Sequence, residues 1–306
     1  MGRKRQRGRN VNGILLLDKA VGLTSNAALQ EVKRLYNAKK AGHTGSLDPL
    51  ASGLLPLCMG EATKLSTFLL DSDKVYEGVC QLGSKTSTGD AEGEVIQTRP
   101  VPAFDEKSVK TVCSQFMGDI EQIPPMHSAI KKDGQPLYKL AHQGIEIERE
   151  PRQVHIYDLD LLDLYENSFK FRLRCSKGTY VRTLVEDMGE VMGCGAHLTD
   201  LRRTQVGPFD LEDASTPEEL AHIAAVEGTA GLDKLLIPMD KALENWPAVH
   251  LSENSTYYVQ QGQPVQVAKA PTSGWVRLFA NNDRFIGVGQ IMDDGRVAPK
   301  RLLNLG

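Results

Sequence analysis

A short loop at residues 41–53 holds the two side chains of this sequence that are best suited to chemistry. It contains one imidazole, His43, and one carboxylate, Asp48, and its three glycines and one proline predict a tight, constrained conformation. A carboxylate can act as a nucleophile and an imidazole can titrate near neutral pH. Alternatively, the aspartate before a proline only forms a turn and the histidine is only hydrogen-bonded. No second histidine or carboxylate stands nearby at ligand spacing, which disfavours a metal site.

Three further segments carry side chains that could complete a site. Tyr76 lies in a strand predicted over 74–79. Tyr180 and Arg182 follow a strand and a glycine turn, at the predicted N-terminus of a helix, where anions bind favourably. Leu201 is an apolar residue beside an arginine pair. Each has an ordinary structural explanation as a half-exposed strand aromatic, a surface charge or a core leucine.

The elements that must position these residues alternate between strands and helices without a repeating unit. Apolar residues predict a buried strand at 13–17, and Asn26 is expected to cap the helix that follows. Alternating residues at 169–175 predict a strand that pairs with the preceding run through 157–161. A capping box at 215–218 predicts another helix. Strands that pair with near neighbours, with helices between them, favour a mixed α+β fold, and no glycine-rich nucleotide loop is present.

The character of the chain changes after about residue 248. Short strands broken by glycine and proline predict a small all-β module at 249–306, behind a larger domain at 1–248. Residues 1–48 include a basic tail at 1–10 and carry ten basic and three acidic residues, although the whole chain has a net charge of −3. A basic front suggests a polyanionic partner held on one face, and a solubilising tail explains the charge equally well.

The composition excludes several classes of protein. With 41% hydrophobic and 25% charged residues, the chain is neither mainly disordered nor a small disulfide scaffold. No apolar run is long enough to predict a membrane span, and no apolar segment follows the basic N-terminus to make a secretory signal. The five cysteines are widely spaced and odd in number, which is typical of reduced cysteines in a cytoplasmic protein.

Several motifs along residues 10–210 stand in the order found in one known family. They are LLLDKAVGLTS, GHTGSLDPLASG, GEATK, KVYEG, IPPMHSAIK, CSKGTYVRTLVEDMG and LRRTQVGPF. In these motifs and their order, the chain resembles the TruB-type bacterial tRNA pseudouridine synthases. Its C-terminal module resembles their PUA-like RNA-binding module. The glycine-, histidine- and aspartate-containing loop pattern is highly specific.

The resemblance implies an isomerase that converts the uridine at position 55, in the T-arm of tRNA, into pseudouridine. Asp48 matches the catalytic aspartate and Arg182 the arginine that pairs with it. Tyr76 matches the tyrosine that packs against the target base and accepts a proton. The remaining matches belong to the pocket and to the RNA contacts: His43, Tyr180, Leu201 and Lys64.

The chemistry of this reaction agrees with those residue types. The target base must leave its stack and enter a closed pocket, and a carboxylate can act there as the covalent nucleophile. A nearby cation such as Arg182 is expected to hold the pKa of Asp48 down. The reaction requires no metal, nucleotide or redox group, so no cofactor is expected. We also expect a cytoplasmic monomer with tRNA as its partner, no obligate protein partner and no membrane.

The sequence departs from the family pattern at three positions. Ala20 stands where a proline is usual, His127 where a tyrosine is usual, and His142 where an arginine is frequent. We expect these changes to affect loop stiffness and RNA contacts, and none of them to touch Asp48, Tyr76 or Arg182.

Three other functions are consistent with parts of the sequence. A non-catalytic RNA-binding protein would use the basic front and the β module alone, and would gain nothing from a carboxylate that faces a polyanion. A guide-RNA-dependent pseudouridine synthase would need a docking extension, which is not evident here. An aspartate-dependent hydrolase such as a glycosidase would need a second carboxylate beside Asp48, and the neighbouring sequence offers none.

Overall fold

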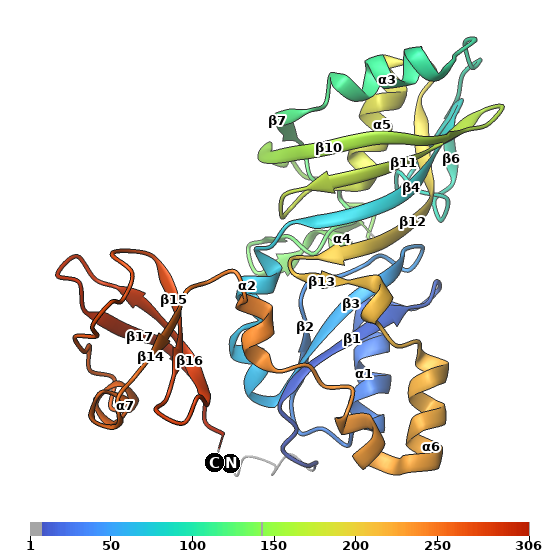
Figure 1. The fold of residues 1–306 in the computed structure, drawn as a ribbon. Coiled ribbons are helices and arrows are strands. Elements are labelled where there is room, and N and C mark those ends of the chain that lie inside the picture. The colour runs from blue at the N-terminus through green and yellow to red at the C-terminus, as the bar shows by residue number, and fades with distance from the viewer. Residues whose placement is uncertain (1–7, 142, 306) are drawn as a thin grey trace.

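The larger part of the protein is built on one mixed sheet of nine strands (Figure 1). The computed structural model describes residues 8–141 and 143–305. The strands of this sheet are β1 (Gly13–Lys19), β2 (Ala41–His43), β3 (Ser52–Met59), β4 (Lys74–Leu82), β7 (Gly118–Gln122), β10 (Arg152–Leu164), β11 (Ser168–Cys175), β12 (Ala196–Val206) and β13 (Phe209–Asp210). Their order is β1-β3-β12-β4-β11-β10-β7, with β2 beside β3 and β13 beside β12. Within the described residues its pairings are antiparallel except that between β12 and β3, as the α+β prediction requires.

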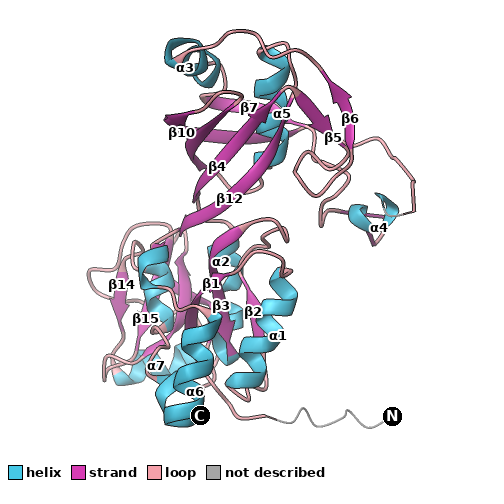
Figure 2. Ribbon diagram, turned by 90° about the vertical axis from the view of Figure 1, so that its right-hand side faces the viewer, coloured by secondary structure: helices cyan, strands magenta, loops and turns pink. Residues whose placement is uncertain are grey.

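Helices cover the two halves of the sheet separately (Figure 2). Helices α1 (Ser25–Leu35) and α6 (Pro217–Asp233) pack on β1 and β3, whereas α3 (Glu106–Ser114) and α5 (Val181–Val191) pack on β4, β11 and β12. The shorter elements are η1 (Gly60–Lys64), α2 (Ser66–Leu70), β5 (Ser84–Thr86), β6 (Val95–Thr98), β8 (Lys131–Lys132), β9 (Gln135–Pro136), α4 (Leu137–Ala141), η2 (Leu211–Asp213) and η3 (Met239–Leu243). Among the described residues, no helix has the length and apolarity needed to cross a membrane.

Strand β3 is buried along its whole length because both of its faces are covered. Leu55 and Leu57 pack with α1 and α6, and Leu54 and Cys58 pack on the opposite side, in a cluster that includes the C-terminal module. Since successive side chains of a strand point to opposite faces, such a strand has a continuous apolar sequence instead of an alternating one. This strand follows directly on the loop that carries Asp48, so it gives the loop a rigid base.

The C-terminal module is a separate four-stranded sheet with the order β14-β15-β16-β17. Its strands are β14 (Ala248–His250), β15 (Trp275–Phe279), β16 (Phe285–Ile291) and β17 (Val297–Leu302), which confirms the predicted short strands. The module also contains one helix that the sequence did not predict, α7 (Glu253–Gln260). Only Val259 of this helix is buried, so its sequence lacks the apolar periodicity that marks a packed helix. The domain division at residue 248 stays a prediction.

Two helices begin at residues other than those predicted. Helix α1 is capped by Thr24, whose hydroxyl accepts a hydrogen bond from the Ala27 amide at 3.1 Å, and Asn26 lies inside the helix. Helix α6 has a reciprocal capping box one residue later than predicted, between Thr216 and Glu219. The reason is Pro217, whose fixed φ suits the first helical position and places the cap directly before it.

Candidate active site

The loop between β2 and β3 holds Asp48 in a fixed position. The Ser25 hydroxyl at the start of α1 accepts a hydrogen bond from the Leu47 amide at 2.7 Å and donates one to the Leu47 carbonyl at 3.0 Å. At the end of the loop, Gly53 has a φ of +99°, and a Cβ there would collide with the Arg203 carbonyl oxygen. Sequence analysis did not single out Ser25, whose contact with Leu47 exists only in the folded chain.

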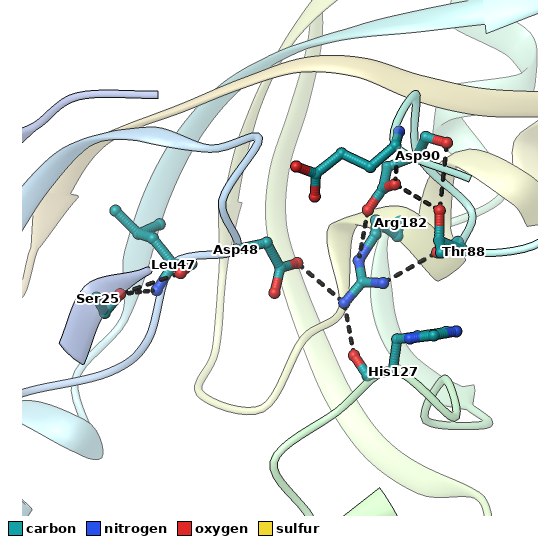
Figure 3. A network of polar contacts seen from close by, with 8 residues as sticks. Ser25, Leu47, Asp48, Thr88, Asp90, His127 and Arg182 are labelled. Atoms are coloured by element: carbon teal, nitrogen blue, oxygen red, sulfur yellow. Dashed lines mark hydrogen bonds and ion pairs between the residues drawn. The ribbon is translucent and has the colours of Figure 1, made fainter. Parts of the chain in front are cut away.

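Asp48 forms an ion pair with Arg182, as the resemblance implied. Arg182 Nη2 lies 2.9 Å from Asp48 Oδ2, and Figure 3 shows the two side chains facing each other from the loop and from α5. The arginine side chain is only 6% exposed, whereas the aspartate side chain is 44% exposed. The carboxylate is therefore open to a substrate on one side and held by a buried cation on the other.

The Arg182 guanidinium is itself fixed by three other oxygen atoms (Figure 3). Its Nη1 donates to the Thr88 carbonyl at 2.9 Å, its Nη2 donates to the His127 carbonyl at 2.8 Å, and its Nε lies 3.6 Å from Asp90 Oδ2. The expectation that His127 does not touch the catalytic set is therefore wrong. The contact is made by the backbone, so it does not depend on which side chain stands at this position.

Asp90 is a second acidic residue of the site that sequence analysis did not find. Its side chain is 4% exposed and accepts hydrogen bonds from the Thr88 hydroxyl and from the Glu92 amide at 3.1 Å. The sequence around Asp90 indicates only a local turn. Asp90 is distant from Asp48 along the chain, so no local pattern links the two residues. Asp90 is buried behind Arg182, so it cannot contact a substrate together with Asp48 as the paired carboxylates of a glycosidase do.

The pKa of Asp48 is raised above its ordinary value. Burial is the largest cause; Arg182 and Lys19 act in the opposite direction, and Asp90 raises the pKa further. The predicted effect of Arg182 is present, and burial together with the second carboxylate outweighs it, so the pKa is raised overall. Lys19 is itself fully buried and donates to two carbonyl groups at 2.7 and 2.8 Å, and burial lowers its pKa to about 8.

Tyr76 and His43 come from two strands of the large sheet, β4 and β2. Tyr76 is half-buried on β4, and burial raises its pKa while Arg203 acts in the opposite direction. The charge of Asp48 also raises the pKa of Tyr76. His43 ends β2; burial and Arg203 lower its pKa, and its Nδ1 has no hydrogen-bond partner among the described residues.

Tyr180 and Leu201 are also brought to this region. Tyr180 is the N-cap residue of α5, where its amide donates to the side chain of Gln122 at 3.0 Å. Burial raises the pKa of its phenol, and Asp48 is among the charges that act on it. Leu201 is 7% exposed on β12 and belongs to the same apolar cluster as Leu47 and Tyr76. These residues give the site an aromatic and apolar lining.

Lys64, which is expected to contact the RNA, lies beside the C-terminal module. It ends η1, pairs with Glu61 at 2.6 Å and donates to the Leu302 carbonyl of the C-terminal module at 2.9 Å. It lines a groove of about 1360 Å³ between the module and the large sheet, beside Trp246 and Trp275, and Asp48 does not line this groove.

Of the three departures from the family pattern, the Ala20 carbonyl accepts a hydrogen bond from the Lys19 amine, and His142 lies outside the described residues.

Comparison with solved structures supports the fold. The chain superposes on a structure titled Crystal Structure of a Cbf5-Nop10-Gar1 Complex with a TM-score of 0.73 and 26% identity, over 95% of this chain and 84% of that one. A structure of an H/ACA RNP bound to a substrate RNA containing 2′-deoxyuridine matches with a TM-score of 0.74 and 22% identity, over 99% and 92% of the two chains.

Comparison of sequences identifies the family. Residues 33–181 match the N-terminal domain of the TruB family pseudouridylate synthases, and 182–244 and 247–303 match C-terminal domains of the same enzymes. The tRNA pseudouridine synthase B of Stutzerimonas stutzeri is 57% identical over 96% of both chains. That of Nitrosococcus oceani is 55% identical over 98% of this chain and 97% of its own. With the Asp48–Arg182 pair in place, the chain belongs to the TruB family of pseudouridylate synthases.

Proposed function

We propose that the protein converts the uridine at position 55, in the T-loop of tRNA, into pseudouridine. The observation that carries this proposal is an accessible carboxylate, Asp48, held by the buried guanidinium of Arg182. The names of relatives that are 55–57% identical over nearly the whole chain support tRNA as the substrate. The enzyme acts in the cytoplasm as a monomer, with no cofactor and no obligate protein partner.

Asp48 is the nucleophile of this reaction. Its carboxylate attacks C1′ of the ribose, and the bond from C1′ to N1 breaks, its electron pair leaving with the uracil. The uracil turns over in the pocket, C5 attacks C1′, and the carboxylate leaves with its electron pair. The proton on C5 then passes to a base while N1 gains a proton, so that no atom is gained or lost overall. A route through a glycal, begun by proton removal at C2′, also requires ionised Asp48.

The lining of the site holds the base during this exchange. The ring of Tyr76 packs on the flipped uracil and its hydroxyl accepts the proton from C5, while Leu201 forms the apolar wall and Tyr180 the second aromatic surface. Unstacking of the target base costs a few kcal/mol. His43 enters the T-loop and replaces the contacts that the base loses when it leaves its stack. Lys64 contacts the RNA outside the pocket, in the groove beside the C-terminal module.

Mapping of pseudouridine in an unmodified tRNA transcript tests the proposal. The purified protein, with EDTA and without any guide RNA, is expected to produce one pseudouridine at position 55 and none in a transcript with cytidine there. A requirement for a guide RNA would instead support a guide-dependent synthase. Tight tRNA binding without isomerisation would support a non-catalytic RNA-binding protein, and loss of activity in EDTA would contradict the absence of a metal cofactor.

The pH dependence of the rate follows from the raised pKa of Asp48. Only the ionised carboxylate is a nucleophile, so the single-turnover rate is expected to fall as the pH decreases through a value above the ordinary aspartate pKa of about 3.9. Circular dichroism at each pH shows whether the protein remains folded. A rate that stays constant to pH 4 in folded protein would exclude a raised pKa for the nucleophile.

An Arg182→Lys variant is expected to lose at least about tenfold in single-turnover rate, although the positive charge is kept. A lysine amine cannot reach the Thr88 and His127 carbonyls and both carboxylates at once, so Asp48 loses its orientation. The measurement is pseudouridine formation with enzyme in excess over tRNA. Near-normal activity would show that Asp48 needs only a nearby charge.

Deletion of residues 2–7 is expected to weaken tRNA binding and to reduce its salt dependence. These residues include four arginine or lysine side chains and lie outside the described residues. Each lost phosphate contact removes about 0.7–0.9 from the slope of log K against log salt, while the rate at saturating tRNA stays the same. Arg9 is kept because it pairs with Asp233 at 2.6 Å and supports the fold. An unchanged slope would show that the tail only increases solubility.

A further inference from the structure

Arg203 carries a buried guanidinium that donates hydrogen bonds to backbone carbonyl groups. Its side chain is 1% exposed, and it forms no ion pair with an acidic residue in the described part of the chain. Its Nε donates to the Leu54 carbonyl at 2.8 Å and its Nη2 to the Gly45 carbonyl at 3.2 Å. Buried charges are normally paired because desolvation is costly. Carbonyl groups satisfy the hydrogen-bond donors and leave the positive charge to act on its surroundings.

The sheet places this arginine between the Asp48 loop and Tyr76. Strand β12 runs between β3 and β4, with Arg203 opposite Gly53 on one side and opposite Tyr76 on the other. Side chains of directly opposed residues lie on the same face of a sheet. The Arg203 side chain therefore lies on the same face of the sheet as Tyr76, directly opposite it, and acts to lower the pKa of the phenol. One side chain therefore contacts the Gly45 backbone of the catalytic loop and lies directly opposite the residue proposed to accept the proton.

The groups whose charges act on Tyr76 come from three parts of the structure. They are Arg203 on β12, Cys175 on β11 and Asp48 in the catalytic loop. Burial raises the pKa of Cys175 to about 12, so this thiol is neutral near pH 7. Arg203 is therefore the one cation among these three groups, and it lowers the pKa of Tyr76, whereas burial and Asp48 raise it.

We propose that Arg203 is a positioning residue of the isomerisation that acts through the hydroxyl of Tyr76. The proposal rests on the role of that hydroxyl under the proposed function. A guanidinium can only donate, so it fixes the phenol oxygen in place and stabilises negative charge on it, which is the form that takes a proton. The C5–H bond then breaks, its electron pair returns to the uracil ring, the proton passes to the Tyr76 oxygen, and N1 takes a proton from solvent.

A double-mutant cycle between Arg203 and Tyr76 tests this role. The measured quantity is single-turnover release of tritium from tRNA that contains uridine labelled at C5. Arg203→Met is expected to slow release about tenfold or more in the parent protein. In a Tyr76→Phe background, where the hydroxyl is already absent, the same change is expected to slow release by less than about twofold. Equal slowing in both backgrounds would overturn the proposal, because a merely structural role does not depend on the hydroxyl.

Arg202 provides a matched control on the same strand. It pairs with Asp18 at 2.6 Å and its side chain is 40% exposed, so Arg202→Met removes a cation that does not touch Tyr76. We expect this control to keep its tritium-release rate within about twofold. If Arg203→Met does not fold, Arg203→Lys serves in the same cycle, since it keeps the charge and loses the fixed geometry of the guanidinium.

Titration of Tyr76 provides a readout that needs no activity. In protein labelled with ¹³C at the tyrosine ζ carbon, the Tyr76 signal is assigned by its absence in Tyr76→Phe. The signal is expected to titrate at higher pH in Arg203→Met than in the parent and the Arg202→Met control; an unchanged titration would overturn the proposal. Arg203 also lowers the pKa values of His43, Lys19 and Lys74, which this tyrosine-specific label does not report. If the parent protein makes no pseudouridine, the proposed function fails, while this titration still decides the coupling.

Discussion

An Asp48→Asn variant is expected to have no measurable turnover while its tRNA affinity stays within about tenfold of the parent. The amide has nearly the shape of the carboxylate, and the loop around it is held by Ser25 and by the backbone, so the RNA-binding surface survives. The amide cannot attack C1′ or remove a proton from C2′, so both routes to the product are closed. Pseudouridine formation and filter binding measure the two effects on the same preparation.

An aspartate outside the site serves as the control for this substitution. Asp293→Asn changes an exposed turn residue of the C-terminal module and is expected to leave both activity and binding unchanged. Parallel loss of binding and activity in Asp48→Asn would indicate a role for Asp48 in RNA binding or folding. Residual activity close to that of the parent would exclude Asp48 as the nucleophile.

A Tyr76→Phe variant is expected to bind tRNA normally and to carry out the chemical step about 10²–10⁴-fold more slowly, the range of a positioned acid or base. The phenyl ring still stacks on the flipped uracil, whereas the hydroxyl that takes the proton from C5 is absent. Single-turnover tritium release from labelled uridine measures the rate of the chemical step directly. Filter binding measures the tRNA affinity, to which stacking on the aromatic ring contributes.

A Tyr76→Leu variant separates the two roles of this side chain. It loses the hydroxyl and the aromatic face together, so it is expected to show the same slow chemistry and, in addition, weaker binding by about 1–3 kcal/mol. If phenylalanine proves as active as tyrosine, Tyr76 is only a stacking surface and the proton leaves through another group. In that case the proposed role of Arg203 also fails, since it acts through the hydroxyl.

Local patterns predicted the elements that carry the site, because those patterns depend on near neighbours. The strand at 13–17 is β1, and the pair of strands through 157–161 and 169–175 is the β10–β11 hairpin. The predicted helix start at Tyr180 is confirmed as well. Where two neighbouring residues could both cap a helix, as at Ser215 and Thr216, propensity alone did not separate them, and the proline at the first helical position decided.

The sequence by itself determined which chemistry the protein carries. The spacing of the glycines around His43 and Asp48, with the later motifs of Tyr76 and Arg182, was specific enough to identify the family and to predict the ion pair. These patterns belong to short segments, so they can be recognised in the sequence without knowledge of the tertiary structure.

Only the tertiary structure decided how the site is tuned. It brought Asp90 behind Arg182, placed Arg203 opposite Tyr76, and placed Lys64 in the groove beside the C-terminal module. It also set the pKa of Asp48 above its ordinary value, although the arginine partner acts in the opposite direction. The physical reason is that desolvation and the field at a carboxylate are sums over every atom packed around it, and those atoms come from segments far apart in the sequence.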